Sequence, residues 1–452
     1  MKGISVVGLG KLGLPMAACL ASKGYKVIGV DVSLKTVMAV NGGRSPIYEP
    51  GLRELLERCR GSLSATDDFN LAIDDSDVTF IVVPTPSNDT GGFSTKFVEA
   101  AVASVGRALR SKQGFHVVAL TSTVLPGVTE RVLRPLLEGA SGKQCGVDFG
   151  LCYNPEFIAL GSVIRDFQNP DMVLIGESDQ RAGEIVADIY RRVCDNGPSL
   201  ARMTPHNAEL TKIALNTYVT MKIAYANTIA ELCENIPGGD VDVVTGALGL
   251  DARIGSRYLK GGLGYGGPCF PRDNKALSFF ARGVGCQAKL CEATDHVNDY
   301  QTDRIVRLVR QKLVEVEGKK IALLGLTYKA DTDVTEESAA LKIATALIQS
   351  GAKVQIYDPS VTSGGWSAPK DEKMTFADSA FACLDGADLC ILATPWQEFA
   401  DLTVEDFQRN MKSPVLLDCW RFFDRPEFRE KLDCLAVGVV PAQQVAKVEV
   451  AS

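Results

Sequence analysis

The first part of the chain contains the glycine motif Val6-Val7-Gly8-Leu9-Gly10-Lys11-Leu12-Gly13. An apolar run from Ile4 leads into it, and a helical pattern from Leu14 to Lys23 follows. Glycines at these spacings permit a tight turn from strand to helix and let backbone amides at the helix N-terminus meet a pyrophosphate. The stretch therefore predicts the first strand and helix of a dinucleotide-binding domain.

A second apolar run, Lys26-Val27-Ile28-Gly29-Val30, ends at Asp31. A carboxylate at this point can accept hydrogen bonds from both ribose hydroxyls of an adenosine, and it repels a 2′-phosphate. A glycine motif alone is weak, but strand, glycines, helix, strand and acid occur here in order. We therefore expect NAD, not NADP, as the cofactor.

Length and composition bound the class of protein. The chain has 452 residues, of which 46% are hydrophobic and 23% charged, and its net charge is −7. That length suits two or three domains, and the acidic balance argues against a general nucleic-acid binder. No apolar run is long enough to span a bilayer, and Met1-Lys2-Gly3 leads directly into the first strand, so we expect neither a leader nor a membrane anchor.

Thirteen cysteines are scattered along the chain without a paired framework or a zinc-like spacing. This usage is typical of a reducing compartment, so we expect a cytoplasmic protein without a metal site, in which most thiols are small core residues. Cys269 differs from the others because it stands in Gly264-Tyr265-Gly266-Gly267-Pro268-Cys269-Phe270-Pro271-Arg272-Asp273. A thiol on a glycine-rich loop, downstream of a dinucleotide fingerprint, indicates an oxidation that passes through a covalent thioester.

The chain also contains an internal repeat. Residues 320–358 run from an apolar strand through a glycine turn and a helical stretch (338–349) to a second strand that ends at Asp358, as residues 4–31 do. The later run 387–395 likewise resembles 76–86. The sequence therefore predicts an α/β fold with two Rossmann-like, doubly wound domains. The second has lost the full glycine pattern, so we expect it to bind a different nucleotide or none.

Between the repeats, Ala208 to Glu234 carries a helical apolar pattern without an internal Gly or Pro. About 27 residues would make a helix roughly 40 Å long, which suits a central spine and a dimer face. Lys212 and Asn216 are one turn apart on it and share one side. Taken alone, that pair could equally be a solvated Lys and Asn on the outside of the helix.

Further polar residues follow predicted strands, where open α/β sheets bind ligands. They are Thr121-Ser122-Thr123 and Asn154-Pro155-Glu156-Phe157. With Glu209-Leu210-x-Lys212-x-x-x-Asn216, Tyr48-Glu49-Pro50-Gly51-Leu52, Pro84-Thr85-Pro86, Arg253-Ile254-Gly255, Gly325-Leu326-x-Tyr328-Lys329, the cysteine loop and the glycine motif, they resemble the nucleotide-sugar 6-dehydrogenases over nearly the whole chain. That family includes UDP-glucose, GDP-mannose and UDP-N-acetylmannosamine dehydrogenases.

The resemblance implies oxidation of a sugar C6 alcohol to a carboxylate with two NAD⁺ and one water, first of all UDP-glucose to UDP-glucuronate. TDP-glucose, GDP-mannose and UDP-N-acetylmannosamine stay open as substrates. It also implies three domains, namely an NAD-binding domain (1–200), a central helical dimerisation domain with the cysteine loop (201–300) and a nucleotide-sugar-binding domain (301–452). We expect a homodimer or larger oligomer, with the active site between domains.

Roles for individual residues follow from chemistry and resemblance together. Cys269 would hold the aldehyde, Lys212 would stabilise the oxyanions, and Asn216 with Asp273 would hold a water. Glu156, through Thr123, would act as base, since none of the three histidines lies in a matched motif. The resemblance implies cofactor contacts at Gly8, Gly10, Lys11, Leu12, Gly13, Asp31, Lys35, Pro84, Thr85, Thr123 and Glu336. It implies substrate contacts at Glu156, Phe157, Ile158, Leu160, Lys212, Asn216, Arg253 (from a neighbouring subunit), Tyr258, Leu259, Lys260, Gly266, Phe270 and Lys329.

The chain departs from the family pattern at four places. Leu160 stands where most relatives have a second acid, Glu336 where they have Arg, and Arg272 where they have Lys. Asp418-Cys419-Trp420-Arg421 replaces the common Asp-Gly-Arg-Asn. Two other classes therefore stay open. A β-hydroxyacid dehydrogenase would need neither Cys269 nor a second nucleotide domain, and a non-catalytic nucleotide-sugar-binding protein would leave Cys269 and Lys212 without a purpose.

Overall fold

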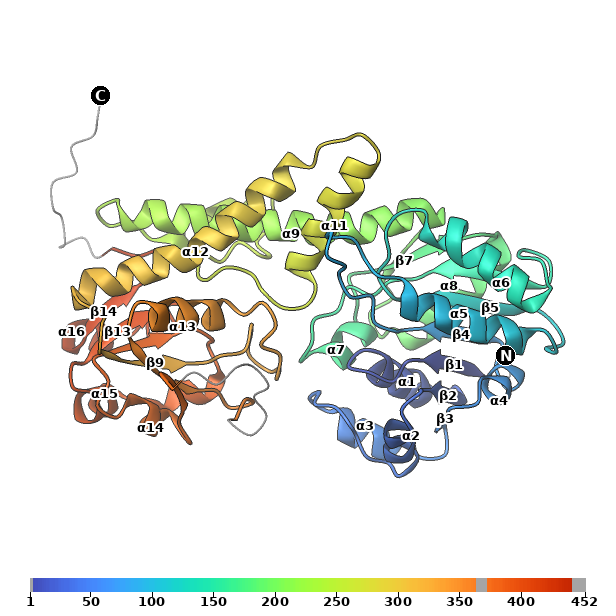
Figure 1. The fold of residues 1–452 in the computed structure, drawn as a ribbon, viewed down its shortest axis with the longest axis horizontal. Helices are drawn as coiled ribbons and strands as arrows, with labels where there is room; N and C mark the ends of the chain where they lie inside the picture. The colour runs from blue at the N-terminus through green and yellow to red at the C-terminus, as the bar shows by residue number, and fades with distance from the viewer. Residues whose placement is uncertain (1–2, 363–371, 441–452) are drawn as a thin grey trace. The chain divides into compact units, whose positions relative to one another are not determined.

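The computed structural model describes residues 3–362 and 372–440, which form two compact units. The first holds the chain up to Leu215 together with Lys275–Gln287, and the second holds Asn216–Asn274 together with the chain from Ala288. Each unit contains its own sheet, parallel in the second unit and mostly parallel in the first (Figure 1). The predicted α/β class with two Rossmann-like domains is confirmed.

The sheet of the first unit has eight strands in the order β3-β2-β1-β4-β5-β6-β7-β8. Its first six strands run parallel in the order of a dinucleotide-binding domain, whereas β7 is antiparallel to β6. The strands are β1 (Ile4–Val7), β2 (Val27–Val30), β3 (Leu63–Thr66), β4 (Val78–Ile81), β5 (His116–Leu120), β6 (Phe149–Tyr153), β7 (Met172–Glu177) and β8 (Ser199–Met203).

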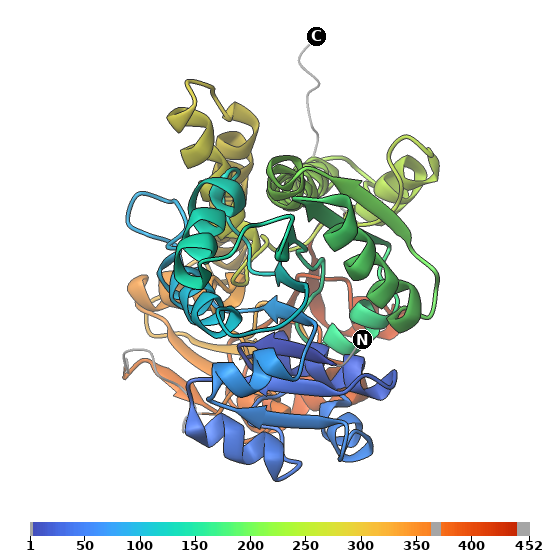
Figure 2. The same cartoon turned by 90° about the vertical axis from the view of Figure 1, so that its right-hand side faces the viewer.

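Helices cover both faces of this sheet, and two hydrophobic cores result. One face packs against α1 (Gly13–Ser22), α2 (Leu34–Asn41), α3 (Leu52–Arg58), α7 (Val163–Gln168) and α8 (Gln180–Val193). The other packs against α4 (Phe69–Asp74), α5 (Lys96–Leu109), a π-helical turn (Thr129–Leu133) and α6 (Arg134–Ser141). In Figure 2, α5 and α6 lie on the opposite side of the sheet from α8. Because both faces are covered, the inner strands β1, β2, β4, β5 and β6 are buried along their whole length, whereas β3 and β8 at the two edges are only partly buried.

The sheet of the second unit confirms the internal repeat. Its six parallel strands have the order β11-β10-β9-β12-β13-β14, which matches the first six strands of the other sheet. They are β9 (Lys320–Leu324), β10 (Lys353–Tyr357), β11 (Met374–Phe376), β12 (Leu389–Leu392), β13 (Val415–Asp418) and β14 (Asp433–Ala436). Helices α12 (Lys289–Leu313) and α13 (Ala339–Gln349) cover one face. The other is covered by α14 (Ala380–Leu384), a 3₁₀ turn (Gln397–Asp401), α15 (Val404–Asn410) and α16 (Pro426–Lys431).

Helix α9 (Pro205–Glu234) is the long helix that the sequence predicts from Ala208. It begins three residues earlier, at Pro205, because proline is well suited to the first position of a helix. Helix α10 (Val241–Leu250) follows it, and α11 (Phe270–Gly283) begins directly after the cysteine loop. The last turns of α9 lie beside α12, joined by an ion pair of 2.6 Å between Arg304 and Glu234 (Figure 1). None of the helices in the described part of the chain is long and apolar enough to cross a membrane.

Candidate active site

The glycine turn after β1 has the geometry that a dinucleotide needs. Gly8 has a φ of +94°, and a methyl group on it would lie 2.3 Å from the Val82 carbonyl oxygen. A methyl group on Gly13 would lie 1.9 Å from the Gly8 oxygen, so both positions require glycine. Gly10 is exposed and has no atom within 4 Å of its missing Cβ, so a pyrophosphate can approach the backbone there. The residues present therefore fit NAD.

Asp31 is held against this turn. One carboxylate oxygen accepts a hydrogen bond of 2.8 Å from the Leu9 amide, and the other accepts one of 2.8 Å from the Ser33 amide. The carboxylate is partly exposed, so lone pairs remain for a ribose. Lys35 lies exposed on the first turn of α2.

In the second unit, Asp358 occupies the position equivalent to Asp31, but it is too buried to bind a ribose. Its exposed fraction is 2%, and one carboxylate oxygen lies within 3.1 Å of four donors. They are the Leu326 and Thr327 amides, the Thr327 hydroxyl and the Trp396 indole nitrogen. A ribose cannot reach this carboxylate, which agrees with the expectation that the second domain does not repeat the nucleotide binding of the first.

The ends of β4 and β5 are tied together by Ser122. Its hydroxyl accepts a hydrogen bond of 2.9 Å from the Val83 amide and donates one of 2.7 Å to the Val83 carbonyl. This fixes the backbone on either side of Pro84, Thr85 and Thr123, three residues predicted to contact the cofactor. Thr85 is buried, whereas Thr123 is partly exposed.

Glu156 lies just beyond the end of β6 and has a strongly perturbed carboxyl group. Burial raises its pKa from 4.5 to about 7, against the opposing effects of a hydrogen bond from the Tyr190 hydroxyl and the charge of Lys212. The Tyr190 hydroxyl also lies 2.8 Å from the Asn154 side-chain oxygen. A carboxyl group with a pKa near neutrality can both accept and release a proton under physiological conditions. Glu156 therefore has the proton affinity that a general base needs.

The Lys212 side chain, on α9, reaches the backbone of Glu156. Its ammonium donates a hydrogen bond of 2.6 Å to the Glu156 carbonyl and lies 4.6 Å from the centre of the Phe157 ring. Lys212 and Asn216 are 8% and 7% exposed. The alternative of a solvated pair on the outside of the helix is therefore wrong. Lys212, Glu156 and Phe157 form one cluster in the first unit.

Two buried carboxylates, for which the sequence predicts no role, hold the loops of this cluster. Glu49 accepts hydrogen bonds from the Gly161 and Val163 amides, at 2.9 and 2.8 Å, and so fixes the segment after Glu156. Glu209 accepts from the Gly127 and Thr129 amides, at 2.5 and 2.8 Å, and ties α9 to the loop that carries Thr123. Both lie in motifs that were recognised, but only the fold reveals their partners.

Cys269 is exposed and occupies the position directly before α11 in the second unit. Its carbonyl accepts the hydrogen bond of the Asp273 amide at 2.8 Å, as a residue that caps a helix N-terminus does. The positive end of the helix dipole favours a thiolate at this point. Of the other twelve cysteines, only Cys286 is also exposed.

The Asp273 side chain joins the cysteine helix to α9. It is fully buried and accepts a hydrogen bond of 2.6 Å from the Asn216 side-chain nitrogen. Its other oxygen lies 3.1 Å from the Arg272 guanidinium, so the arginine that replaces the usual lysine has a partner within the loop. The structure thus brings Asn216 and Asp273 together, one turn from Cys269.

Aromatic rings surround the start of α11. The Phe270 ring packs edge-on against Tyr258 and Tyr265, with 6.3 Å between ring centres in both pairs. Tyr258 has a φ of +62° and is exposed, and Leu259 after it is buried. Lys260 and Arg253 are exposed, and Arg253 forms an ion pair with Asp251 within its own chain. The predicted role of Arg253 in a neighbouring subunit stays a prediction.

The loop after β9 packs against the cysteine loop. The Gly267 amide donates a hydrogen bond of 3.0 Å to the Glu336 carbonyl, and a methyl group on Gly266 would lie 2.2 Å from the Glu337 oxygen. Gly267, with a φ of +80°, packs against the Tyr328 ring. Lys329 follows Tyr328 and is partly exposed.

Two Rossmann-type domains, a glycine turn open to a pyrophosphate and a thiol at a helix N-terminus define a dinucleotide-dependent oxidoreductase. Three models of one family match the chain: UDP-glucose/GDP-mannose dehydrogenase family, NAD binding domain (residues 2–194), central domain (206–300) and UDP binding domain (322–425). The chain belongs to the UDP-glucose/GDP-mannose dehydrogenase family, and its cofactor is NAD. The β-hydroxyacid dehydrogenase alternative is therefore wrong.

Individual relatives resemble the chain over most of its length. The UDP-glucose 6-dehydrogenase of Haloferax volcanii is 38% identical over 433 residues, which are 95% of this chain and 98% of the relative. The GDP-mannose 6-dehydrogenase of Pseudomonas aeruginosa is also 38% identical, over 79% of this chain and 81% of its own. The structure of a UDP-glucose dehydrogenase from Pyrobaculum islandicum has a TM-score of 0.88 at 34% identity and covers 97% of this chain and 98% of its own.

Proposed function

We propose that this chain oxidises the C6 alcohol of a nucleotide-diphosphate hexose to the carboxylate, in two hydride transfers, with Cys269 as the nucleophile. UDP-glucose is the proposed substrate and UDP-glucuronate the product. The observation that carries the proposal is the exposed thiol of Cys269 at the start of α11, one turn from the hydrogen-bonded pair Asn216 and Asp273. A binding protein without catalysis would have no use for this arrangement.

Glu156 serves the first oxidation as base. Its pKa of about 7 lets the carboxylate accept the C6 hydroxyl proton, relayed through the Thr123 hydroxyl and a water. NAD⁺ held at the glycine turn of Gly8, Gly10 and Gly13 would supply the hydride acceptor, and each of the two oxidations would use one NAD⁺. Lys212 stabilises the negative charge that develops on the substrate oxygen, since its ammonium is buried beside Glu156 and Phe157.

Cys269 serves the second oxidation. Its thiolate adds to the aldehyde carbon, and the resulting oxyanion is stabilised by Lys212. Loss of the second hydride from C6 converts the thiohemiacetal into a thioester. Water then attacks the thioester carbon, the C–S bond breaks, and the thiol and the carboxylic acid are released. Asp273 and Asn216 hold and orient that water.

Two observations bear on the substrate. The second Rossmann-like domain matches a UDP-binding model, and Lys329 is partly exposed in the loop after β9, so this domain is proposed to bind the nucleotide diphosphate through Lys329. A relative named UDP-glucose 6-dehydrogenase and one named GDP-mannose 6-dehydrogenase are both 38% identical to the chain, over 95% and 79% of its length. GDP-mannose is therefore the second candidate, and UDP-N-acetylmannosamine and TDP-glucose complete the set.

NADH formation with a panel of these four nucleotide sugars tests the proposal. UDP-glucose should give the highest kcat/KM, and Cys269→Ala should abolish acid formation while binding of the nucleotide sugar, measured by calorimetry, survives. Higher kcat/KM with GDP-mannose would move the substrate to the second candidate. Binding without any NADH formation across the panel would identify a non-catalytic protein.

A further inference from the structure

The residues before Cys269 form a buried segment that belongs to no helix or strand. Between Leu259 and Gly267 all but Lys260 and Gly264 are buried, although Cys269 itself is exposed. Buried backbone amides and carbonyls need hydrogen-bond partners, and within residues 3–362 and 372–440 no strand pairs with this segment to supply them. Side chains must therefore take the place of a strand.

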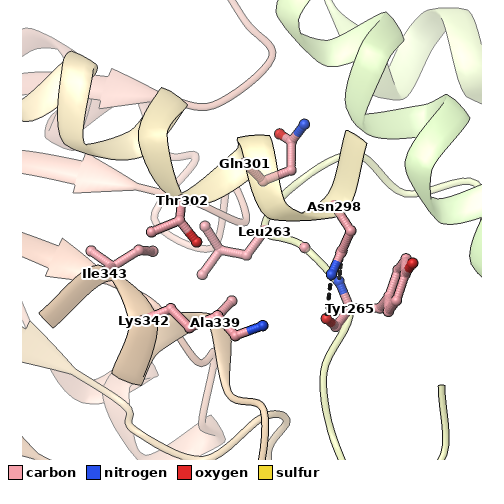
Figure 3. Close-up of a pocket in the computed structure, with 9 residues that line it drawn as sticks. Leu263, Tyr265, Asn298, Gln301, Thr302, Ala339, Lys342 and Ile343 are labelled. Carbon is pink, nitrogen blue, oxygen red and sulfur yellow. Dashed lines mark hydrogen bonds between the residues drawn. The ribbon is translucent and has the colours of Figure 1, made fainter. Parts of the chain in front are cut away.

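Two asparagines do so. The Asn227 side chain, from α9, accepts a hydrogen bond of 2.8 Å from the Gly262 amide and donates one of 3.2 Å to the Leu263 carbonyl. The Asn298 side chain, from α12, accepts one of 2.7 Å from the Tyr265 amide and donates one of 3.0 Å to the Tyr265 carbonyl. Figure 3 shows this second pair. An amide group offers one donor and one acceptor side by side, as an adjacent strand would.

Of the two asparagines, Asn298 bonds to the residue that is nearer to Cys269 along the chain. Gly264 lies so close to it that a methyl group there would be 2.6 Å from the Asn298 side-chain oxygen. After Tyr265 the chain turns through Gly266 and Gly267, whose amide bonds to the Glu336 carbonyl, and reaches Cys269. The path of the chain from Tyr265 to Cys269 is thus fixed at Tyr265 by α12 and at Gly267 by the loop after β9.

We propose that Asn298 is a positioning residue for Cys269, a role that rests on the proposed function of that thiol. Its amide holds the segment so that the thiol stays at the N-terminus of α11. When the amide is lost, the buried Tyr265 amide and carbonyl lose their partners, and the segment moves to find others. The thiol then leaves the end of the helix dipole and no longer meets the aldehyde at the correct distance.

Asn298→Asp is the sharpest test because it keeps the shape and the acceptor but turns a second oxygen toward the Tyr265 carbonyl. Gln301→Ala is the matched control. Gln301 lies on the same helix, is 3% exposed and lines the same small cavity of Figure 3, but its side chain bonds to Val297 and Arg304 on α12.

In Asn298→Asp, kcat should fall roughly tenfold or more, since about 1 Å of misplacement has such effects. NADH per sugar consumed should fall below the two of the wild type as aldehyde escapes capture. The pH profile of Cys269 alkylation by iodoacetamide should move to higher pH, because the displaced thiolate is no longer stabilised by the helix dipole. Access of the reagent should not change, since the thiol is already exposed in the wild type. Gln301→Ala should keep kcat within about twofold and both other readouts unchanged.

If Asn298→Asp matches Gln301→Ala in NADH ratio and alkylation profile, the proposal is overturned, whatever its thermal stability. Should Asn298→Asp not fold, Gly264→Ala perturbs the same contact from the loop side and carries the same expectations. A wild-type ratio of one would refute the proposed function instead. The alkylation comparison requires no turnover and would still decide the role of Asn298.

Discussion

Removing the phenolic hydroxyl of Tyr190 should raise the pKa of Glu156 above its value of about 7. The hydroxyl donates to the Glu156 carboxylate and thereby opposes the effect of burial on that pKa. Tyr190→Phe keeps the ring, which is 1% exposed and packs against Phe167, so the core should hold. The carboxyl group should then stay protonated to higher pH.

A hydrogen bond to a charged group contributes about 1.5–3 kcal/mol, which corresponds to about 1 to 2 pH units. If Glu156 acts as base, the acidic limb of the kcat/KM profile should move upward by that amount. At pH 7 the ionised fraction would fall from about a half to between about 1% and 10%, so kcat/KM should fall about 5- to 50-fold and recover near pH 9.

The assay is kcat/KM for the nucleotide sugar from pH 5.5 to about 9.5, with Glu156→Gln and the double variant as controls. Glu156→Gln should remove the limb, and adding Tyr190→Phe to it should change nothing further. A limb that stays in place in Tyr190→Phe, or one that persists in Glu156→Gln, would refute the assignment of Glu156 as the base.

Three further outcomes are expected. Glu336→Arg should lower the Michaelis constant for NAD⁺ more than that for the sugar, because a carboxylate near the phosphates of the dinucleotide is repelled by on the order of a few kcal/mol. An unchanged or higher Michaelis constant for NAD⁺ means that the loop with Glu336 does not face the cofactor. The wild type should be at least a dimer by light scattering, because four large apolar side chains are exposed, namely Tyr225 and Leu232 on α9 and Val243 and Leu250 on α10. The double variant Leu232→Glu with Leu250→Glu should dissociate the dimer. An active wild-type monomer would contradict this prediction. Folding raises the pKa of Glu156 from 4.5 to about 7, so between these pH values the folded state retains a proton that the unfolded chain releases. The resulting stabilisation is complete below pH 4.5 and is lost as the pH rises to 7. Glu156→Gln should therefore reduce the fall of Tm between pH 4.5 and 7, and an unaltered slope of Tm against pH would argue against the raised pKa.

Most of the fold could be predicted from local sequence patterns. The glycine turn, the run to Asp31 and their echo at residues 320–358 determine where β1, β2, β9 and β10 begin and end, because strand, turn and helix signals act within a few residues. The antiparallel pairing of β7 with β6 was not predicted. Strand direction within a sheet depends on contacts between distant segments, which one sequence does not display.

The site divides in the same way. Residues within motifs, such as Cys269, Lys212 and Glu156, could be selected from sequence, and Lys212 and Glu156 do meet. Tyr190 lies 34 residues from its partner Glu156, and Asn298 lies 33 from Tyr265, in helices with no distinguishing pattern. Asp358 looks like a ribose-binding acid until Trp396, 38 residues later, is seen to cover it. Such roles arise only once the fold brings the partners together.

The number of NADH molecules formed per nucleotide sugar consumed distinguishes a four-electron oxidation through Cys269 from a two-electron oxidation. Cys269, by retaining the aldehyde for a second oxidation, predicts a ratio of two, with the carboxylic acid as the only sugar product and no aldehyde captured by added hydroxylamine. A ratio of one, with free aldehyde in solution, would contradict the four-electron oxidation through Cys269.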